Sequence, residues 1–367
     1  MEGKHTHPVR CAIVPPYLLA RLAELDDPRF TAAAEAARRS LRVDEPIRSL
    51  RVEERYNSLL PGTSAPRAVS VPGTPNRTIG DAEQLQVVPG RIVRREGEPA
   101  TADVTVNEAY DGLGATHSLY WDRYERDSID DDGLPLDATV HYGRDYDNAF
   151  WDGERMVFGD GDGEIFNRFT VSLSVIAHEL THGVTQYTAN LVYQGQSGAL
   201  NESVSDVFGA LAEQNAAGQS VDQASWLIGE GLFTDQVEGT ALRSMKAPGT
   251  AYDDDVLGKD PQPDSMAGYI ETDDDNGGVH LNSGIPNRAF YLVAEAIGGY
   301  AWEAAGQIWY DTLTGPNLRR TADFAMFARA TAIAAAQRFG ANSIEHEAVV
   351  AGWQGVGLAV DPLQAAS

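Results

Sequence analysis

Apolar residues recur with a helical period through most of the second half of the chain. A spacing of three and four residues between apolar positions is typical of amphipathic helices that bury one face. Glycine and proline interrupt the pattern at intervals, as they do between helices. The pattern predicts four helices in the C-terminal region, at residues 290–297, 301–313, 322–339 and 343–353.

The pattern from residue 77 to residue 170 is different, because short alternating apolar runs are separated by glycines. Alternation with a period of two predicts strands, here at residues 85–88, 91–93 and 138–141. Residues 104–127 show a looser helical repeat and predict one helix within this β-rich region. The Gly-Asp-Gly-Asp-Gly run at 159–163 lacks the downstream glutamate of a calcium-binding EF-hand loop, so we interpret it as a turn.

The N-terminal residues form a third region. Two prolines in the Val-Pro-Pro-Tyr run at 14–17 predict an extended segment, and residues 18–23 and 30–41 predict short helices. Residues 59–75 are rich in proline, glycine, serine and threonine, as exposed and easily cleaved linkers are. This order predicts a removable segment, and the helical periodicity argues against the alternative of a disordered tail.

Composition limits the classes of protein that fit. The 367 residues are 43% hydrophobic, which suits two folded domains and an additional segment. A net charge of −26 argues against a nucleic-acid partner, since phosphate binding requires a basic face. We expect no membrane span and no intramolecular disulfide, because Cys11 is the only cysteine.

The chemistry of the chain is concentrated at His178-Glu179-Leu180-Thr181-His182. Two histidines four residues apart lie on one face of a helix and can bind one metal ion, while the adjacent glutamate can act as a general base. A catalytic zinc site needs a third protein ligand and an open position. Glu202 can supply that ligand, and Asp206, one turn further along, can accept the N–H of a ligand histidine. An ordinary helix with solvated charges is the alternative, and the second motif argues against it.

Three motifs together resemble those of the thermolysin-like zinc endopeptidases: HELTH at 178–182, NESVSD at 201–206 and DNGGVHLNSG at 275–284. The N-terminal residues resemble the short-propeptide, protealysin-like branch of that family through residues 14–17 and 77–79. The resemblance implies an α+β fold with the zinc-binding helix at the cleft between two domains. It divides the chain into a prosegment over the cleft (1–60), a linker (61–76), a β-rich domain ending in the HExxH helix (77–190) and an α-helical domain (191–367).

The resemblance also implies the roles of individual residues. Zinc would be held by His178, His182 and Glu202, with Glu179 as the base that activates water. Tyr193 and His280 would stabilise the oxyanion, and Asp275 would orient His280. The remaining positions would bind an extended substrate: Asn148 and Ala149 on an edge strand, Arg243 at a substrate carbonyl, and Phe166, Val175, Ile228 and Leu242 around an apolar pocket.

Each of these roles has an alternative. The pocket residues are also ordinary core residues, Arg243 could form a structural ion pair, and His280 taken alone could be structural. The apolar pocket predicts cleavage before Leu, Phe, Ile or Val. Cys11 could cap the zinc in the precursor, since thiolate is a good zinc ligand, or it could be a small buried apolar residue.

The chain departs from the family at its calcium-binding positions. Glu213 and Glu230 remain, but serine or leucine stands where other acids are expected, at Ser174, Ser225 and Leu227. Calcium requires several oxygen ligands, so we expect zinc and either a weak calcium site or none.

The complete expectation is a monomeric zinc endopeptidase made as an autoinhibited proenzyme, whose partners are peptide or protein substrates and its own prosegment. With no Sec-type signal in the sequence, it would be made in the cytoplasm and retained there, or secreted by a non-classical route. A zinc aminopeptidase and a non-catalytic binding protein on a protease scaffold are the competing hypotheses. The sequence lacks the strand with which an aminopeptidase would bind a free amine. It contains the full set of zinc ligands and the base, which argues against a non-catalytic protein.

Overall fold

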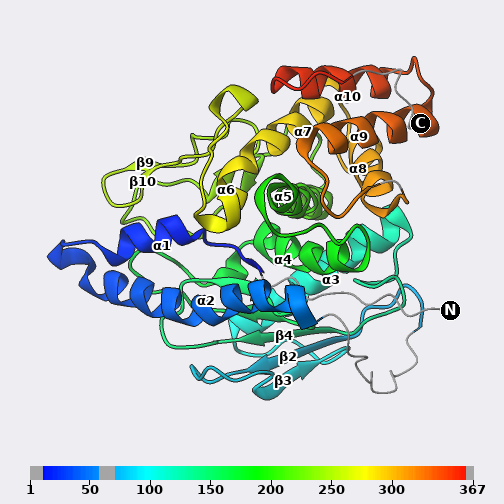
Figure 1. Ribbon diagram of the computed structural model, residues 1–367. Coiled ribbons are helices and arrows are strands. Elements are labelled where there is room, and N and C mark those ends of the chain that lie inside the picture. Colours follow the sequence, from blue (N-terminus) through cyan, green and yellow to red (C-terminus); the bar gives the residue numbers. More distant parts are fainter. Residues whose placement is uncertain (1–10, 58–70, 317, 361–367) are drawn as a thin grey trace.

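The computed structural model describes residues 11–57, 71–316 and 318–360, and for residues 11 and 45–57 it describes the backbone alone. Most of the expected linker (61–76) therefore lies outside the described residues. A sheet occupies one side of the molecule and a group of helices the other, with the N-terminal helices lying across both (Figure 1).

Within the described residues, the main sheet has six strands in the order β1-β5-β6-β4-β2-β3. Strands β2, β4 and β6 run parallel, while β3, β5 and β1 are antiparallel to their neighbours. The strands comprise β1 (Cys11–Ala12), β2 (Arg77–Asp81), β3 (Arg91–Arg95), β4 (Leu136–Val140), β5 (Ala149–Trp151) and β6 (Met156–Phe158). Strand β5 would be the edge of this sheet without β1, so the N-terminal residues complete the sheet.

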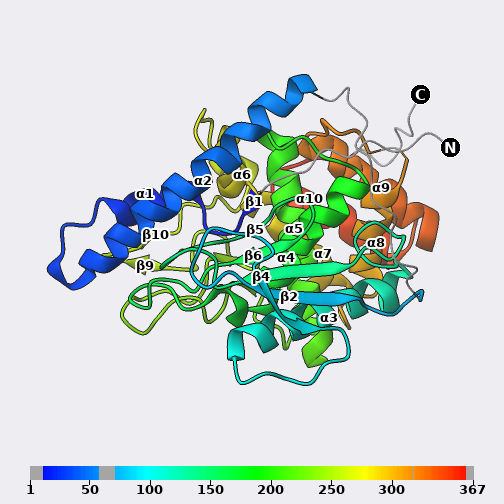
Figure 2. The ribbon, with the colours of Figure 1, turned by 90° about the horizontal axis from the view of Figure 1, so that it is seen from below.

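The rest of the N-terminal region forms a helical hairpin. It contains α1 (Pro16–Ala23), the 3-10 helix η1 (Pro28–Phe30) and α2 (Thr31–Asn57). Pro15 and Pro16 start α1, where a missing N–H is no loss. Figure 2 shows α2 running across the molecule above the sheet strands. Helix α2 is longer than the expected helix at 30–41, which the apolar pattern alone did not reveal.

Two buried helices, α4 (Leu173–Tyr187) and α5 (Gly195–Ala217), link the sheet to the helical part of the molecule and pack along each other. Helix α3 (Val104–Tyr124) and the 3-10 helix η2 (Phe169–Val171) pack beside α4. The close approach of α4 and α5 depends on Gly209, where an added Cβ would lie 2.6 Å from the Ser174 carbonyl oxygen. Both helices are buried on nearly all sides, including the polar residues that they carry.

The C-terminal region is largely helical. Its helices are α6 (Asp275–Asn282), α7 (Gly284–Ile297), α8 (Ala304–Thr314), α9 (Phe324–Phe339) and α10 (Ile344–Gly355). Two short strand pairs and a 3-10 helix precede them: β7 (Leu227–Ile228) with β8 (Arg243–Ser244), β9 (Asp253–Asp254) with β10 (Gly258–Lys259), and η3 (Met266–Gly268). The four helices expected from the apolar repeat are therefore confirmed as α7 to α10. None of the described helices has the length and apolarity that crossing a bilayer requires.

One expected strand is wrong. Residues 85–88 form bends outside any strand, and Leu85, Val87 and Val88 are about half exposed. The alternating apolar residues predicted a strand here, but such a pattern does not show whether a partner strand lies beside it. The strands expected at 91–93 and 138–141 are present as β3 and β4.

Candidate active site

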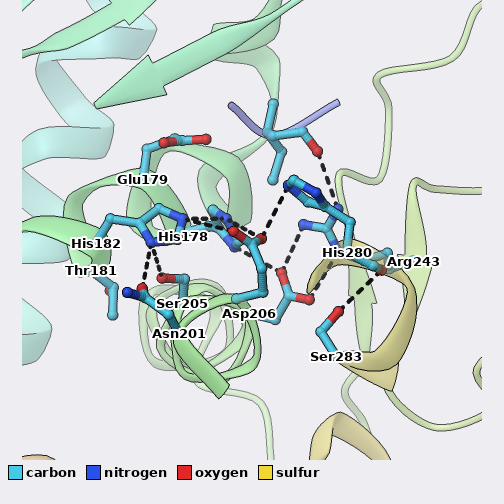
Figure 3. A network of polar contacts seen from close by, with 12 residues as sticks. His178, Glu179, Thr181, His182, Asn201, Ser205, Asp206, Arg243, His280 and Ser283 are labelled. Atoms are coloured by element: carbon cyan, nitrogen blue, oxygen red, sulfur yellow. Dashed lines mark hydrogen bonds and ion pairs between the residues drawn. The ribbon is translucent and has the colours of Figure 1, made fainter. Parts of the chain in front are cut away.

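Three buried side chains from α4 and α5, those of His178, His182 and Glu202, converge on one point, and Figure 3 shows the two histidines with the polar residues around them. The Nε2 atoms of His178 and His182 lie 3.0 Å apart. The two carboxylate oxygens of Glu202 lie 3.5 Å from His178 Nε2 and 3.6 Å from His182 Nε2. A tetrahedral zinc ion binds its ligand atoms at about 2.1 Å, and this geometry places the ligand atoms roughly 3.4 Å from one another. The three side chains therefore fit the ligand shell of one zinc ion.

The hydrogen bonds of the two imidazole rings decide which nitrogen faces this space. His178 Nδ1 lies 2.8 Å from an Asp206 carboxylate oxygen, and His182 Nδ1 lies 2.8 Å from the Asn201 side-chain oxygen. Both partner oxygens can only accept, so each Nδ1 carries the proton and each Nε2 presents a lone pair. Two lone pairs and a carboxylate converging at a buried point form a donor set that favours a cation.

Glu179 is a second carboxylate close to the histidines. Its ligating oxygen and the nitrogens of His178 and His182 lie within 4.8 Å of one another, so Glu179 by distance alone could also be a metal ligand. Its Oε2, however, accepts the backbone N–H of Trp151 at 3.0 Å. Glu202 approaches both histidines more closely than that limit and points between them. These distances favour Glu202 over Glu179 as the third ligand of a metal ion held by the two histidines.

His280 and Tyr193 approach the same space from other elements. His280 Nε2 lies 3.5 Å from a Glu202 oxygen and 3.3 Å from the Tyr193 hydroxyl, which also donates to Glu202. Asp275 accepts from His280 Nδ1 at 2.7 Å and from its backbone N–H at 2.8 Å. Burial alone would lower the pKa of His280, but the charges of Asp275 and Glu202 outweigh it and raise the pKa. Asp275 and Glu202 thus favour the protonated form of His280.

The start of α6 explains how Asp275 reaches His280. Residues 276–278 have positive φ values of 52°, 82° and 73°, so the chain turns tightly before the regular helix begins. At Gly277 an added Cβ would also lie 3.1 Å from Gln194 Nε2. Glycine is the residue that adopts such a conformation without steric cost, and it folds Asp275 back over the imidazole.

Arg243, on β8, connects the site to the N-terminal segment. Its Nε and Nη2 donate to the two oxygens of Asp206, each at 2.8 Å. Its Nη1 donates to the backbone oxygen of Ile13 at 3.2 Å. Burial would raise the pKa of Asp206, but Arg243 and His178 lower it to about 2. Asp206 is therefore a fixed negative charge shared between a ligand histidine and an arginine that binds a peptide carbonyl.

The same N-terminal segment forms hydrogen bonds with Asn148 and Ala149 at the start of strand β5. The N–H of Ile13 donates to the Ala149 carbonyl at 3.1 Å, and the N–H of Val14 donates to the Asn148 side-chain oxygen at 2.9 Å. Asn148 also donates to the Val14 carbonyl at 3.4 Å. An extended peptide thus lies along the sheet edge with its direction and register set by main-chain contacts.

The four expected pocket residues are all buried. Phe166, Val175, Ile228 and Leu242 belong to one continuous apolar cluster, which also contains the Ile13 side chain. Ile228 and Leu242 are joined by a backbone hydrogen bond of 2.9 Å beside Arg243. The expected zinc-capping role of Cys11 concerns a side chain outside those that the structure describes.

Reasoning from the sequence missed several side chains that hold the site. Asn201 and Ser205, whose hydroxyl lies 3.1 Å from His182 Nδ1, belong to the same NESVSD motif; Asn201 directly precedes Glu202 and Ser205 follows it by three residues. Their place in the motif is a signal that could have identified them. Asn287, which donates to Asp206 at 2.8 Å, and the Trp151 N–H have no comparable signal, because only the fold brings them to the site.

Comparisons with known proteins agree with this geometry. Residues 90–186 match the catalytic domain of thermolysin metallopeptidases, and residues 189–358 match their alpha-helical domain. An extracellular metalloprotease of Pectobacterium carotovorum subsp. carotovorum is 51% identical over 352 residues, which are 95% of this chain and 97% of that protein. Protease PrtS of Photorhabdus sp. (strain Az29) is 50% identical over 292 residues, 79% of this chain and 78% of that protein.

A solved structure shares the whole architecture. The precursor of protealysin, a metalloproteinase from Serratia proteamaculans, is 50% identical, with a TM-score of 0.85 over 95% of this chain and 100% of that one. The thermolysin-like fold, with its β-containing N-terminal domain and helical C-terminal domain, is therefore confirmed. Both family matches, the high identity to full-length relatives and the converging histidines lead to one conclusion: the chain belongs to the thermolysin family of zinc-dependent metalloendopeptidases.

Proposed function

We propose that His178, His182 and Glu202 hold the zinc ion of this endopeptidase and that Glu179 is its general base. The observation that carries the assignment is the spacing of 3.0 to 3.6 Å between the ligand atoms of those three side chains. Zinc supplies Lewis-acid activation of the peptide carbonyl and of water. Glu179 takes the proton of the attacking water and passes it to the leaving nitrogen.

His280 and Tyr193 donate hydrogen bonds to the oxyanion that develops on the substrate carbonyl. Support comes from their shared approach to Glu202 and from Asp275, which favours the protonated form of His280. Donors aimed at a developing negative charge in a buried site stabilise the transition state more than they would in water.

Substrates bind as an additional strand on β5. Asn148 and Ala149 bind the backbone of the substrate and Arg243 binds a carbonyl, as they bind residues 13–14 of this chain. Phe166, Val175, Ile228 and Leu242 form the pocket for the side chain after the scissile bond. Ile13 is fully buried and its carbonyl is bound by Arg243, the neighbour of Leu242, which supports a preference for bulky apolar residues.

Residues 1–60 are a prosegment that inhibits the enzyme by occupying this strand position. The described part, from residue 11, covers the cleft and uses the hydrogen bonds that a substrate requires. The full-length match to a protealysin precursor supports the same function. Residues 61–76 are the linker to be cut, and residues 77–190 and 191–367 form the two domains on either side of the zinc.

Two further proposals concern the calcium-binding positions and the cellular location of this enzyme. Ser174, where an acid is expected, hydrogen-bonds Glu213, and this contact supports the loss of the paired calcium site. The extracellular relative supports an extracellular location for the mature enzyme, and the prosegment would keep the precursor inactive until then.

The test uses the purified full-length chain and a fluorogenic peptide blocked at both ends, which an aminopeptidase cannot cleave. We expect hydrolysis before Leu or Phe once the prosegment is removed, loss of hydrolysis with a zinc chelator, and recovery on adding zinc. The Glu179→Gln variant should bind zinc yet show no hydrolysis. Glu154→Gln, at an exposed surface glutamate, is the matched control. An active Glu179→Gln variant would refute the assignment of the base.

A further inference from the structure

Helix α2 of the prosegment is attached to the loop that precedes β5. Arg39 Nη2 forms an ion pair with Asp145 Oδ2 at 2.8 Å. On the next residue of the helix, the Ser40 hydroxyl oxygen accepts the backbone N–H of Asp147 at 2.9 Å, and both residues are fully buried. These contacts place one face of α2 directly over the loop.

A third residue of α2 extends the contact to the substrate-binding residue itself. The two carboxylate oxygens of Asp44 accept from the Tyr146 hydroxyl at 2.6 Å and from Asn148 Nδ2 at 3.0 Å. Asn148 is the side chain that also binds Val14. The attachment of α2 and the occupation of β5 are therefore joined through one short loop.

Asp147 is the unusual member of this loop. Its side chain is fully buried, and neither of its carboxylate oxygens makes a well-formed hydrogen bond among the residues that the structure describes; the backbone N–H of Asp162 approaches it and opposes the effect of burial only weakly. Burying an ionised carboxylate without a partner costs much more free energy than burying the neutral acid. The attached state of α2 thus favours Asp147 with a proton.

The charges around Asp147 act in the same direction. Burial raises the pKa of Asp147 well above its ordinary value, the charges of Asp162 and Asp145 raise it further, and Arg39 of α2 opposes them. Asp162 belongs to the 159–163 turn, and its Oδ1 accepts three backbone N–H groups at 2.6 to 3.1 Å. When Asp147 ionises, the carboxyl groups of Asp145 and Asp162 and one half-exposed arginine, Arg39, surround it. The loop then carries an excess of negative charge.

We propose that Asp147 is a proton-dependent latch: the prosegment is held while Asp147 is protonated, and ionisation of Asp147 loosens α2 and starts activation. The proposal rests on the proposed inhibitory function of the prosegment. When α2 lifts from the loop, Asp147 gains water and can ionise at its ordinary pKa. Ionisation therefore favours the detached state, and Asn148 is freed for a substrate.

The sign of the pH effect follows from this difference. The attached state binds one proton that the detached state releases, so attachment is strongest at low pH and weakens as pH rises between the two pKa values. One such proton changes the equilibrium by up to about tenfold per pH unit within that range. Activation should accelerate with rising pH, and the increase should depend on one residue.

The first experiment follows activation of the full-length chain from about pH 5 to about pH 8, above the ordinary pKa of an aspartate, by N-terminal sequencing and by peptide hydrolysis. Rates are divided by the activity of the mature enzyme at each pH. We expect a rise of several-fold per pH unit for the natural chain and a slow, nearly pH-independent rate for Asp147→Asn. Asp145→Asn, which removes the half-exposed ion pair with Arg39 and one neighbouring negative charge, should activate faster and move the transition to lower pH while keeping the slope.

The second experiment needs no catalysis. In full-length Glu179→Gln, hydrogen-exchange protection of the α2 amides at residues 31–44, corrected for intrinsic rates, should fall between low and high pH. Adding Asp147→Asn should remove that fall. Asp162→Asn, which removes a neighbouring charge but keeps an acceptor for the three N–H groups, should move the transition to lower pH.

Three results would overturn the latch. They are an unchanged pH slope in Asp147→Asn, protection of α2 that does not vary with pH, and release that responds to added Ca²⁺ through Asp147 but not to pH. In all three, the proposed inhibitory function survives provided that the uncut chain stays inactive. An uncut chain as active as the mature enzyme would instead refute the prosegment's inhibitory function itself.

Discussion

Arg243 and Asp206 form a two-point ion pair in which Nε and Nη2 each donate to a carboxylate oxygen at 2.8 Å, and both side chains are almost completely buried. The pair connects a ligand histidine on one side to a bound peptide carbonyl on the other. A structural and a substrate-binding function of the arginine are therefore compatible, because one guanidinium makes both the ion pair and a contact with a peptide carbonyl.

The first prediction concerns this arginine. Arg243→Lys keeps the charge but loses the planar, two-point geometry and the third donor. We expect kcat/KM to fall by about 100-fold, which is a loss of roughly 3 kcal/mol in transition-state stabilisation. The precursor should also release its prosegment more readily, since the bond to Ile13 is lost. Steady-state kinetics of the mature enzyme and the rate of self-processing measure the two effects, with the exposed Arg144→Lys as control. Unchanged kinetics in Arg243→Lys would refute the substrate contact.

The second prediction concerns Asp275 and the pH profile. Asp275 raises the pKa of His280, so the histidine stays protonated to higher pH. In Asp275→Asn the pKa should fall, and His280 would lose its proton at lower pH. The alkaline side of the kcat profile should therefore move to lower pH, and kcat should fall by about tenfold or more because a positioned donor is weakened. An Asp275→Asn profile identical to that of the natural enzyme would show that His280 does not act as a donor.

The third prediction concerns stability and His141, which lies away from the zinc site. Its Nδ1 lies 2.8 Å from Asp160 and its Nε2 2.9 Å from Asp103. The hydrogen bond to Asp160 has the largest effect on the pKa of His141; burial opposes it, Asp103 supports it, and the pKa rises from 6.5 to about 9. A raised pKa stabilises the fold fully below pH 6.5, and this contribution is lost as pH rises towards 9.

The measurement is the free energy of unfolding as a function of pH. The contribution of His141 amounts to at most about 3 kcal/mol, and partial exposure reduces it. His141→Gln should lower stability at pH 6 and flatten the pH dependence between roughly pH 6.5 and pH 9, the range of the shift. His346→Gln on α10 serves as the control, for which the slope should remain. A slope that persists in His141→Gln would assign it to other groups.

The fourth prediction concerns the packing of α4 against α5. An alanine at Gly209 would place its Cβ 2.6 Å from the Ser174 backbone oxygen. Overpacking at such a contact costs about 1–3 kcal/mol, and moving α5 away would also displace Glu202 from the histidines. Thermal unfolding and zinc affinity should both decline. Gly355→Ala, where the Cβ meets only the end of the Leu292 side chain at 2.8 Å, is the matched control and should change neither greatly.

The helices and the ligand spacing could be predicted because they are local properties of the chain. His178 and His182 are one turn apart on any helix, and the apolar repeat of α7 to α10 reports one buried face. The failed strand at 85–88 and the length of α2 show where local patterns stop. Whether an apolar run is a strand depends on a neighbour, and the extent of α2 depends on contacts such as those of Ser40 and Asp44 with a loop about a hundred residues away.

The sequence by itself determined which chemistry this protein carries, because the motif spacings place the ligand residues and the base on helix faces wherever the rest of the chain lies. Only the tertiary structure decided how that chemistry is held and covered. Asn287 reaches Asp206, the Trp151 N–H reaches Glu179, and residues 13–14 lie on β5 because distant segments pack together. Contacts between distant segments are set by the packing of the complete core, which a local pattern of residues does not encode.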